Sequence, residues 1–250
     1  MRQQPTLDRK AKNSANPANS RKAEQNYSRS LRKLAQEVGR LIGAFPAGDP
    51  ASVAPITDML EKYSQALDGW ALRTASAMVA EVEARDRKAW LQASADISEA
   101  LRHEIWTAPT GEAMKALLAE QVTLIKSIPL DAAKRVHELT LAGLENSSRG
   151  SEIVAEIKRS GEVSVSRANL IARTETARAA SVLTQARAQH IGSEGYIWRI
   201  AGDSDVRHSH KQMNGKFVRW DSPPTLSDGT TTHAGQIYNC RCYPEPVLPE

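Results

Sequence analysis

The sequence predicts an α+β protein: a mainly α-helical N-terminal body with long helices, and a small β-rich C-terminal module packed on the long helix. Two observations predict this class. From Tyr27 to Gly192, apolar residues recur at every third or fourth position, which is the spacing of amphipathic helices. After Gly195 the chain changes to short β-rich segments that Gly, Pro, Asn and Asp separate.

Residues 1–26 form a basic leader that we expect to be disordered when free. Residues 1–33 hold nine Lys and Arg against Asp8 and Glu24, a net charge of +7, whereas the whole chain carries +4. The basic excess therefore belongs to this segment, which could meet DNA phosphates or an acidic protein surface. A solvated tail is the alternative. The candidate nucleic-acid contacts are Arg2, Arg9, Lys10, Lys12, Arg21 and Lys22.

Residues 27–129 are expected to be a helical region. A first helix ends at the break AFPAGDP (44–50), and a second begins near Ile56, with Gly69 as an interruption. The segment TAPTGEAM (107–114) breaks the helical pattern again before a further helix.

Residues 130–250 are expected to form one domain, with a long helix at 165–191 and a β-rich end at 195–247. Pro129 indicates a helix start at the beginning of this domain, and Ser164 or Ser166 is placed to cap the long helix. Gly192 is expected to end it as a left-handed C-cap. In the β-rich end, Asn214-Gly215 predicts a hairpin with a type I′ turn.

The two cysteines of the chain, Cys240 and Cys242, raise the question of a metal site. On a strand, residues two apart project from the same face. With His210 and one of His208, His233 or Asp203, they could form a tetrahedral zinc site, for which the candidate set is His210, His233, Cys240 and Cys242. The favoured alternative is a structural cluster, in which His210 and Asp203 bond the backbone and Arg207. We therefore expect no cofactor, with zinc as the alternative.

Catalytic patterns are incomplete. Cys240 with His210 or His233 is a conceivable nucleophile–base pair, and DSDVRHSH (203–210) offers residue types that a metal-dependent nuclease uses. The third element of either mechanism is not recognisable, so we expect no enzymatic activity. A metal-dependent hydrolase or toxin-like effector that uses the His/Cys cluster is the alternative.

The stretch RTETAR on the long helix combines Arg173, Glu175 and Arg178. Glu175 and Arg178 are three residues apart and therefore neighbours on a helix. Arg173 or Glu175 could also reach Asp203 or Arg207, and such a buried pair would fix the docking of the helix on the β-rich end.

Four linked segments resemble the phage Mu F-like minor head proteins, the head morphogenesis family of tailed bacteriophages. They are ARTETARA (172–179), YIWRIAGDSDVRHSH (196–210), MNGKFVRWDSPP (213–224) and HAGQIYNCRC (233–242), and the resemblance covers about 130–246. Ala234 departs from the pattern, which usually has Pro before the Gly, but we expect the turn at Gly235 to remain. The residues that match are Arg173, Glu175, Arg178, Trp198, Asp203, Arg207, His210, Gly215, Gly235, Asn239, Cys240, Arg241 and Cys242.

The resemblance implies a minor capsid protein that associates with the portal during procapsid assembly. Its implied partners are the phage portal protein, capsid or scaffolding proteins and, during packaging or ejection, phage DNA. The implied location is the interior of the phage head, after assembly in the host cytoplasm. We expect no membrane contact, because apolar runs fall short of the ~18–20 residues of a membrane helix and the start of the chain lacks a secretory signal. Eight residues follow Cys242, so no toxin domain is expected there.

Overall fold

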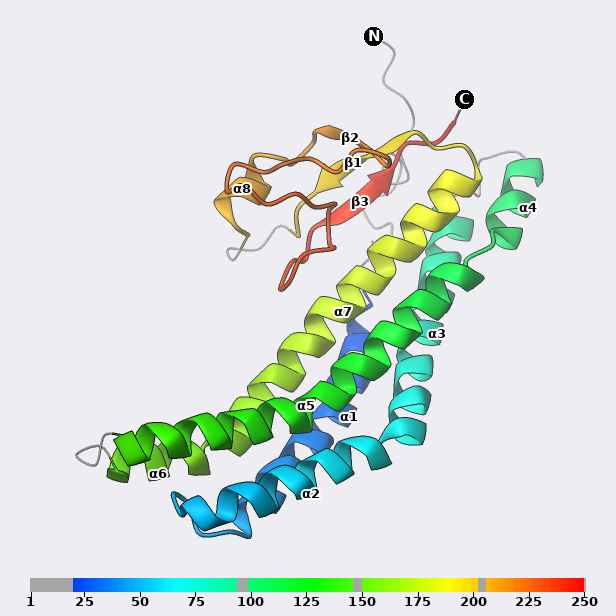
Figure 1. Cartoon of the computed structure of the whole chain (residues 1–250). Helices are drawn as coiled ribbons and strands as arrows, with labels where there is room; N and C mark the ends of the chain where they lie inside the picture. The colour runs from blue at the N-terminus through cyan, green and yellow to red at the C-terminus, as the bar shows by residue number, and fades with distance from the viewer. Residues whose placement is uncertain (1–19, 94–98, 146–149, 202–205, 250) are drawn as a thin grey trace. The chain divides into compact units, whose positions relative to one another are not determined.

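The computed structural model describes residues 20–93, 99–145, 150–201 and 206–249. The chain is mainly helical and carries a small antiparallel sheet toward its C-terminus, as Figure 1 shows, which confirms the predicted α+β class. The helices are α1 (Arg21–Gly43), the 3-10 helix η1 (Pro50–Ser52), α2 (Val53–Ala66), α3 (Asp68–Ala93), α4 (Glu99–Thr107), α5 (Gly111–Glu145), α6 (Gly150–Lys158), α7 (Ser160–His190) and α8 (His208–Lys211). The strands are β1 (Gly195–Arg199), β2 (Phe217–Arg219) and β3 (Tyr243–Pro246).

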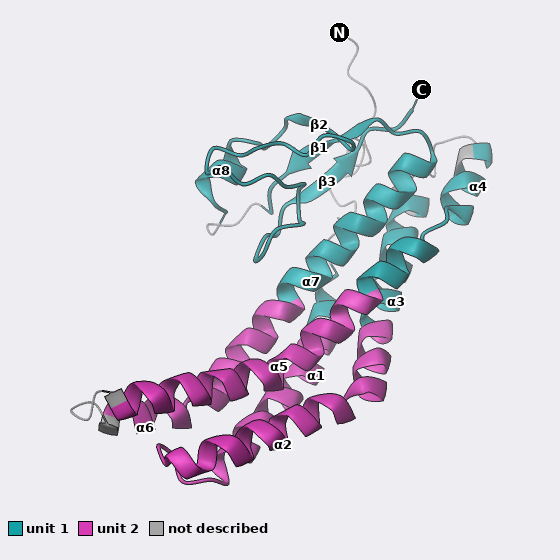
Figure 2. Cartoon of the chain, in the orientation of Figure 1, with its two compact units in different colours: residues 1–24, 78–117, 173–250 teal, residues 25–77, 118–172 magenta. Residues whose placement is uncertain are grey.

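The chain divides into two compact units, which Figure 2 distinguishes by colour. Unit 1 takes its described residues from 1–24, 78–117 and 173–250, and unit 2 consists of 25–77 and 118–172. Both units are discontinuous in sequence. Each of the predicted regions 27–129 and 130–250 therefore contributes residues to both units.

Unit 2 is helical, and its core gathers apolar side chains from α1, α2, α5 and α6. Tyr27 on α1 donates from its hydroxyl to Gln121 on α5 at 3.0 Å, which satisfies two buried polar groups. A Cβ at Gly39 would lie 2.8 Å from the Cα of Gly161, so a larger residue would push α1 and α7 apart. The buried core residues are Val38, Ile42, Ile56, Leu60, Ala132, Ala133, Val136 and Ile157.

Unit 1 contains the sheet, whose strands are antiparallel in the order β2-β1-β3. In the central strand β1, Tyr196 and Trp198 alternate with less buried residues and are both 0% exposed. Because side chains alternate between the two faces of a strand, this pattern puts both rings into the core. That core also includes Trp90 and Ile105 from the helices and Val218, Trp220, Leu226, Cys240, Cys242 and Leu248 from the C-terminal part.

Two predicted helix starts are wrong. Pro129 lies inside α5 and does not begin a helix. Proline removes a hydrogen bond from a helix interior, but Ile125, Ile128 and Ala132 on either side of it are buried, so packing outweighs the local cost. The long helix α7 begins at Ser160, and Ser164 lies within it, where its hydroxyl donates to the Ser160 carbonyl at 2.9 Å.

The two predicted turns have different outcomes. Gly192 follows α7 with a φ of +80°, as expected of a left-handed C-cap. At Asn214-Gly215, the Lys216 amide donates to the Met213 carbonyl at 2.9 Å and Gly215 has a φ of +81°. Asn239 is the one non-glycine residue with positive φ in the described part of the chain, so the turn is not type I′. It leads from α8 into β2 and does not join two strands directly.

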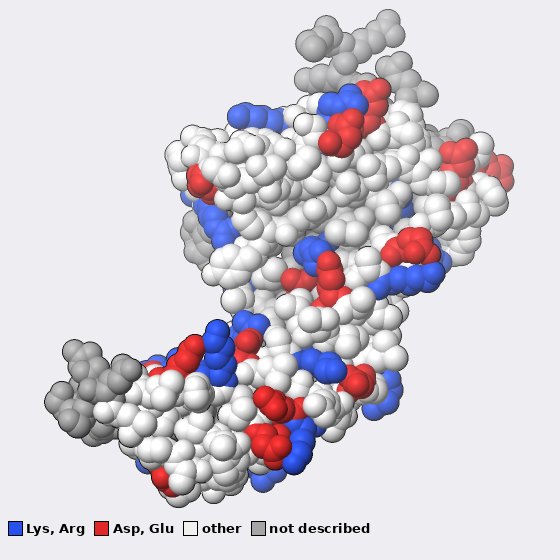
Figure 3. Space-filling model, in the orientation of Figure 1, with Lys and Arg blue, Asp and Glu red and all other residues white. Residues whose placement is uncertain are grey.

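Charged side chains of both signs are mixed on the surface. On the face that Figure 3 shows, Lys and Arg lie among Asp and Glu in each unit. None of the helices in the described part of the chain combines the length and the apolar character that crossing a bilayer requires.

Candidate functional site

Three buried side chains of unit 1 converge at one point: His210, Cys240 and Cys242. The Nδ1 atom of His210 lies 3.4 Å from the Sγ atom of each cysteine. All three residues are at most 3% exposed, and their potential ligand atoms lie within 4.8 Å of one another. The structure thus brings together three of the four residues in the predicted metal set.

Local hydrogen bonds and a ring contact hold this cluster. His210 occupies the short helix α8, where Ser209 donates from its hydroxyl to the Asp228 carboxylate at 2.7 Å. The Trp198 ring from β1 stands edge-on to the His210 ring, with centroids 5.6 Å apart. The Cys242 amide donates to the Cys240 sulfur at 3.3 Å. These contacts fix the imidazole and at least one sulfur before any ligand binds.

The two thiols are inequivalent. A hydrogen bond from Cys242 lowers the pKa of Cys240, and contacts with His210 and with the Cys242 amide act in the same direction. That same hydrogen bond raises the pKa of Cys242, and burial raises it further. Cys240 is therefore the more acidic thiol of the pair.

A small cavity adjoins the three residues. Its volume is about 60 Å³, enough for one or two water molecules at about 30 Å³ each. Sites for small-molecule substrates have volumes of roughly 300–1,000 Å³. The described residues around the cluster therefore accommodate an ion or a water molecule but not an organic substrate. The lining consists of Val206, Arg207, His210, Asn239, Cys240, Arg241 and Cys242.

The other candidate ligands lie elsewhere. His233 does not join the cluster. Its Nδ1, one of its two possible metal-binding nitrogens, is 3.1 Å from the Tyr196 hydroxyl. Burial lowers the pKa of His233, which favours its neutral form. His208 is exposed, with its Nε2 3.1 Å from the Gln212 amide. Asp203 lies outside the described residues.

The RTETAR stretch contacts the segment that carries the cysteines. Arg173 donates to the side-chain oxygen of Asn239 at 3.4 Å, and the Asn239 amide donates to the Thr174 hydroxyl at 2.9 Å. Arg178 donates to Glu175 at 3.2 Å, as expected for neighbours on a helix. Arg207 donates to the Tyr238 carbonyl at 3.0 Å. Asn239, the residue before Cys240, thus connects the segment that carries the cysteines with α7.

Gly235 lets the same segment pass close to α7. It has a φ of +79°, and an added Cβ would lie 2.7 Å from the Cys242 carbonyl oxygen and 3.3 Å from the Ser181 Cβ. Ser181 also donates from its hydroxyl to the Ala234 carbonyl at 2.7 Å. The turn is therefore formed with Ala234 in place of the proline that the pattern usually has. Arg241 is exposed between the two buried cysteines and lines the cavity.

The candidate DNA-contacting residues fall into two groups. Arg21 and Lys22 begin α1 and are exposed, and the Lys22 ammonium lies 3.9 Å from Glu81. The other four residues, Arg2, Arg9, Lys10 and Lys12, lie outside the described residues.

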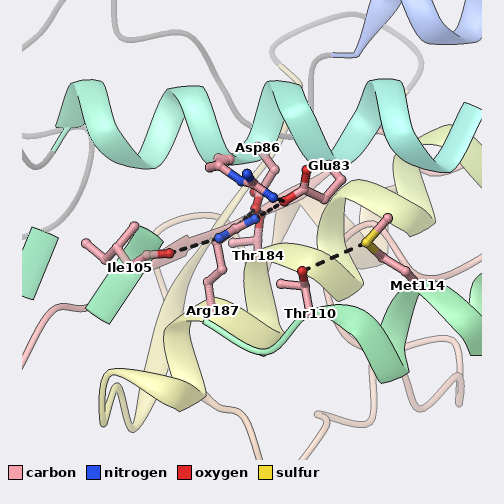
Figure 4. A network of polar contacts seen from close by, with 8 residues as sticks. Glu83, Asp86, Ile105, Thr110, Met114, Thr184 and Arg187 are labelled. Atoms are coloured by element: carbon pink, nitrogen blue, oxygen red, sulfur yellow. Dashed lines mark hydrogen bonds and ion pairs between the residues drawn. The ribbon is translucent and has the colours of Figure 1, made fainter. Parts of the chain in front are cut away.

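A second buried cluster, which the sequence patterns did not reveal, surrounds Arg187 on α7 (Figure 4). Arg187 is 0% exposed and donates to Asp86 at 2.8 Å, to the Ile105 carbonyl at 2.9 Å and to Glu83. The Thr184 hydroxyl donates to the other Asp86 oxygen at 2.6 Å. One guanidinium thus connects α7 with α3 and the end of α4.

The environment of Asp86 is unusual for a carboxylate. Burial raises its pKa to about 6, although the bonds from Thr184 and Arg187 act in the opposite direction. A signal for this cluster is present in the sequence, because Asp86 falls between Val82 and Trp90 on the apolar stripe of α3. A charge on such a stripe needs a buried partner.

Comparisons with known proteins agree with the motifs. Residues 134–244 match the family model described as "Phage Mu protein F like protein". An uncharacterized protein of Haemophilus influenzae (strain Rd) is 34% identical over 137 residues, which are 55% of this chain and 30% of that relative. The chain therefore spans about a third of the length of this relative. No solved structure matches the chain.

The matched range contains all four segments on which the resemblance depends, from 172–179 to 233–242. It also contains His210, both cysteines and the contacts of Asn239 with α7. The resemblance is thereby confirmed over this range, in which residues 134–244 match the model of the phage Mu F-like family.

Proposed function

We propose that this protein is a minor head protein of a tailed bacteriophage, which associates with the portal while the procapsid assembles and becomes part of the virion. The observation that carries the proposal is the family match over residues 134–244. Capsid and scaffolding proteins are the further partners that fit this role, and the host cytoplasm is where such assembly takes place.

The arrangement of the motif residues supports a structural role for the domain. Asn239 bonds Arg173 and Thr174, while Arg207 bonds a backbone carbonyl. The cluster of His210 with the two cysteines is buried beside a cavity of only about 60 Å³. These groups bond one another within the protein, which favours a binding or assembly function over the hydrolase or effector alternative.

Co-purification with the portal protein tests the assembly role. The portal protein encoded beside this chain in the same phage genome is co-expressed with it. We expect the chain to elute together with the ring that the portal protein forms. The portal of an unrelated phage serves as the control and should elute alone. Separate elution from the cognate portal, together with absence from purified heads, would contradict the proposal.

DNA contact through the basic leader is a separate part of the proposal. Neutralising Arg2, Arg9, Lys10 and Lys12 with glutamine is expected to weaken non-specific DNA binding at low salt. For every phosphate that the variant no longer neutralises, the slope of log K against log salt should fall by about 0.9. Fluorescence anisotropy with a labelled duplex measures this slope.

A matched control is the replacement of Lys115 and Lys134, whose side chains are 75% and 74% exposed on α5. This variant should bind DNA as the unmodified chain does. If both variants show the same slope as the unmodified chain, the leader does not contact DNA.

A further inference from the structure

The cluster of His210, Cys240 and Cys242 has the composition of a site for a soft divalent cation. We propose that these three residues bind one Zn²⁺ ion through the His210 Nδ1 and the two cysteine sulfurs. Thiolate and imidazole are the ligands that zinc prefers, and zinc needs no particular geometry from its d-electrons. This site is independent of the proposed role in head assembly.

The spacing of the donor atoms fits zinc. Bond lengths of about 2.3 Å to sulfur and 2.0–2.1 Å to nitrogen place the N and S ligands of a tetrahedral ion about 3.6 Å apart. The His210 Nδ1 lies 3.4 Å from each sulfur. Both separations therefore need a change of only a few tenths of an ångström when the ion enters.

The surroundings suit a bound cation. Two thiolates and a neutral imidazole balance the charge of Zn²⁺, so the buried site as a whole becomes neutral. The Cys242 amide already donates to the Cys240 sulfur at 3.3 Å, and hydrogen bonds to ligand atoms orient them for the metal. The cavity of about 60 Å³ contacts all three residues and has room for a water molecule as the fourth ligand.

The ion joins parts of the chain that are distant in sequence. His210 belongs to α8, whereas the cysteines directly precede β3. Binding energy at such a site contributes to folding. The ion therefore stabilises the C-terminal part of unit 1, and its removal should lower the melting temperature of the whole chain.

Metal analysis of the full chain tests the site. The protein is purified under reducing conditions and dialysed first against buffer that contains zinc and then against metal-free buffer. Bound metals are then measured by mass spectrometry. We expect about one zinc ion per chain, and less than about a tenth of this in Cys240→Ser and Cys242→Ser, which keep the size but lose the thiolate. His208→Asn is the matched control on α8, since its side chain is exposed, and it should retain the ion.

Cobalt provides a second measurement that does not depend on the variants folding. Co²⁺ added to the zinc-free chain is expected to give the visible absorption of a tetrahedral ion and the near-ultraviolet band of a cobalt–thiolate bond. Two results would each overturn the proposal: a folded chain that takes up neither zinc nor cobalt, or metal retained equally by Cys240→Ser and the unmodified chain. Circular dichroism establishes that the chain is folded in each case.

Discussion

Replacing Arg187 with methionine is expected to lower the free energy of unfolding by about 3–5 kcal/mol. Methionine fills much of the space of the arginine stem but cannot donate hydrogen bonds. The guanidinium is fully buried and bonds Asp86, Glu83 and the Ile105 carbonyl. Without it, the Asp86 carboxylate stays buried with the Thr184 hydroxyl as its remaining donor in the network. Urea denaturation followed by circular dichroism measures the loss of stability.

The effect of Arg187→Met should depend on pH. Burial places the pKa of Asp86 at about 6 in the folded protein, above its ordinary value of 3.8. A folded pKa above the unfolded one means that this group stabilises the fold most at low pH and loses that contribution as pH rises from about 4 to 6. Removing the Arg187 charge raises the folded pKa further. The loss of unfolding free energy in Arg187→Met should therefore be smaller at pH 5 than at pH 8.

Two variants separate the buried cluster from a general effect of losing an arginine. Arg219→Met removes an exposed arginine that pairs with Asp221 at 3.0 Å, and it should leave the free energy of unfolding almost unchanged. Arg187→Met combined with Asp86→Leu replaces the buried pair by apolar groups and should recover much of the stability. Equal denaturation midpoints for Arg187→Met and Arg219→Met would show that the cluster does not hold α3, α4 and α7 together.

Local sequence signals predicted the fold class because helices and turns depend on near neighbours. The apolar spacing indicates the helices, and the left-handed conformation of Gly192 follows from its chemistry. Pro129 shows where such signals fail. A proline inside a helix is unfavourable locally, but the buried Ile125, Ile128 and Ala132 belong to one continuous face of α5. That face becomes visible only when the core of unit 2 is known.

The candidate site was predicted in part, for a similar reason. The prediction placed Cys240 and Cys242 on a strand, but both lie just before β3. They still meet His210, which was selected from the motif. His233 was an equally suitable residue type, but the Tyr196 hydroxyl binds its Nδ1. That contact depends on the register of β1 against the loop that precedes the cysteines, which the sequence does not specify.

Arg187 was missed because its partners are about a hundred residues away in the chain. Its position between the buried Leu183 on α7 and the buried Ile191 just after this helix indicates burial, and a buried arginine requires acceptors. The carboxylates of Glu83 and Asp86 on α3 meet that requirement. A cation on the apolar stripe of one helix, together with anions on the apolar stripe of another, therefore predicts a buried cluster of this kind.

Replacing Trp198 with alanine is expected to lower the free energy of unfolding by about 3–5 kcal/mol. The indole is 0% exposed in the core of unit 1, between the Tyr196 ring at 6.5 Å and the His210 ring at 5.6 Å. Removing it leaves a cavity that the close-packed rings cannot fill by small movements. Thermal denaturation of the zinc-free chain measures this packing effect without the contribution of a metal.

Trp106→Ala is the matched control, because it deletes the same side chain at a position in unit 1 that is 54% exposed. The Arg87 guanidinium lies 5.1 Å from its ring, and the expected cost of removing this exposed ring is at most about 1 kcal/mol. Since Trp198 also stands against the His210 ring, its removal should weaken retention of zinc, whereas Trp106→Ala should not. Equal shifts in melting temperature for the two variants would mean that the sheet and the His210 cluster do not share one packed core.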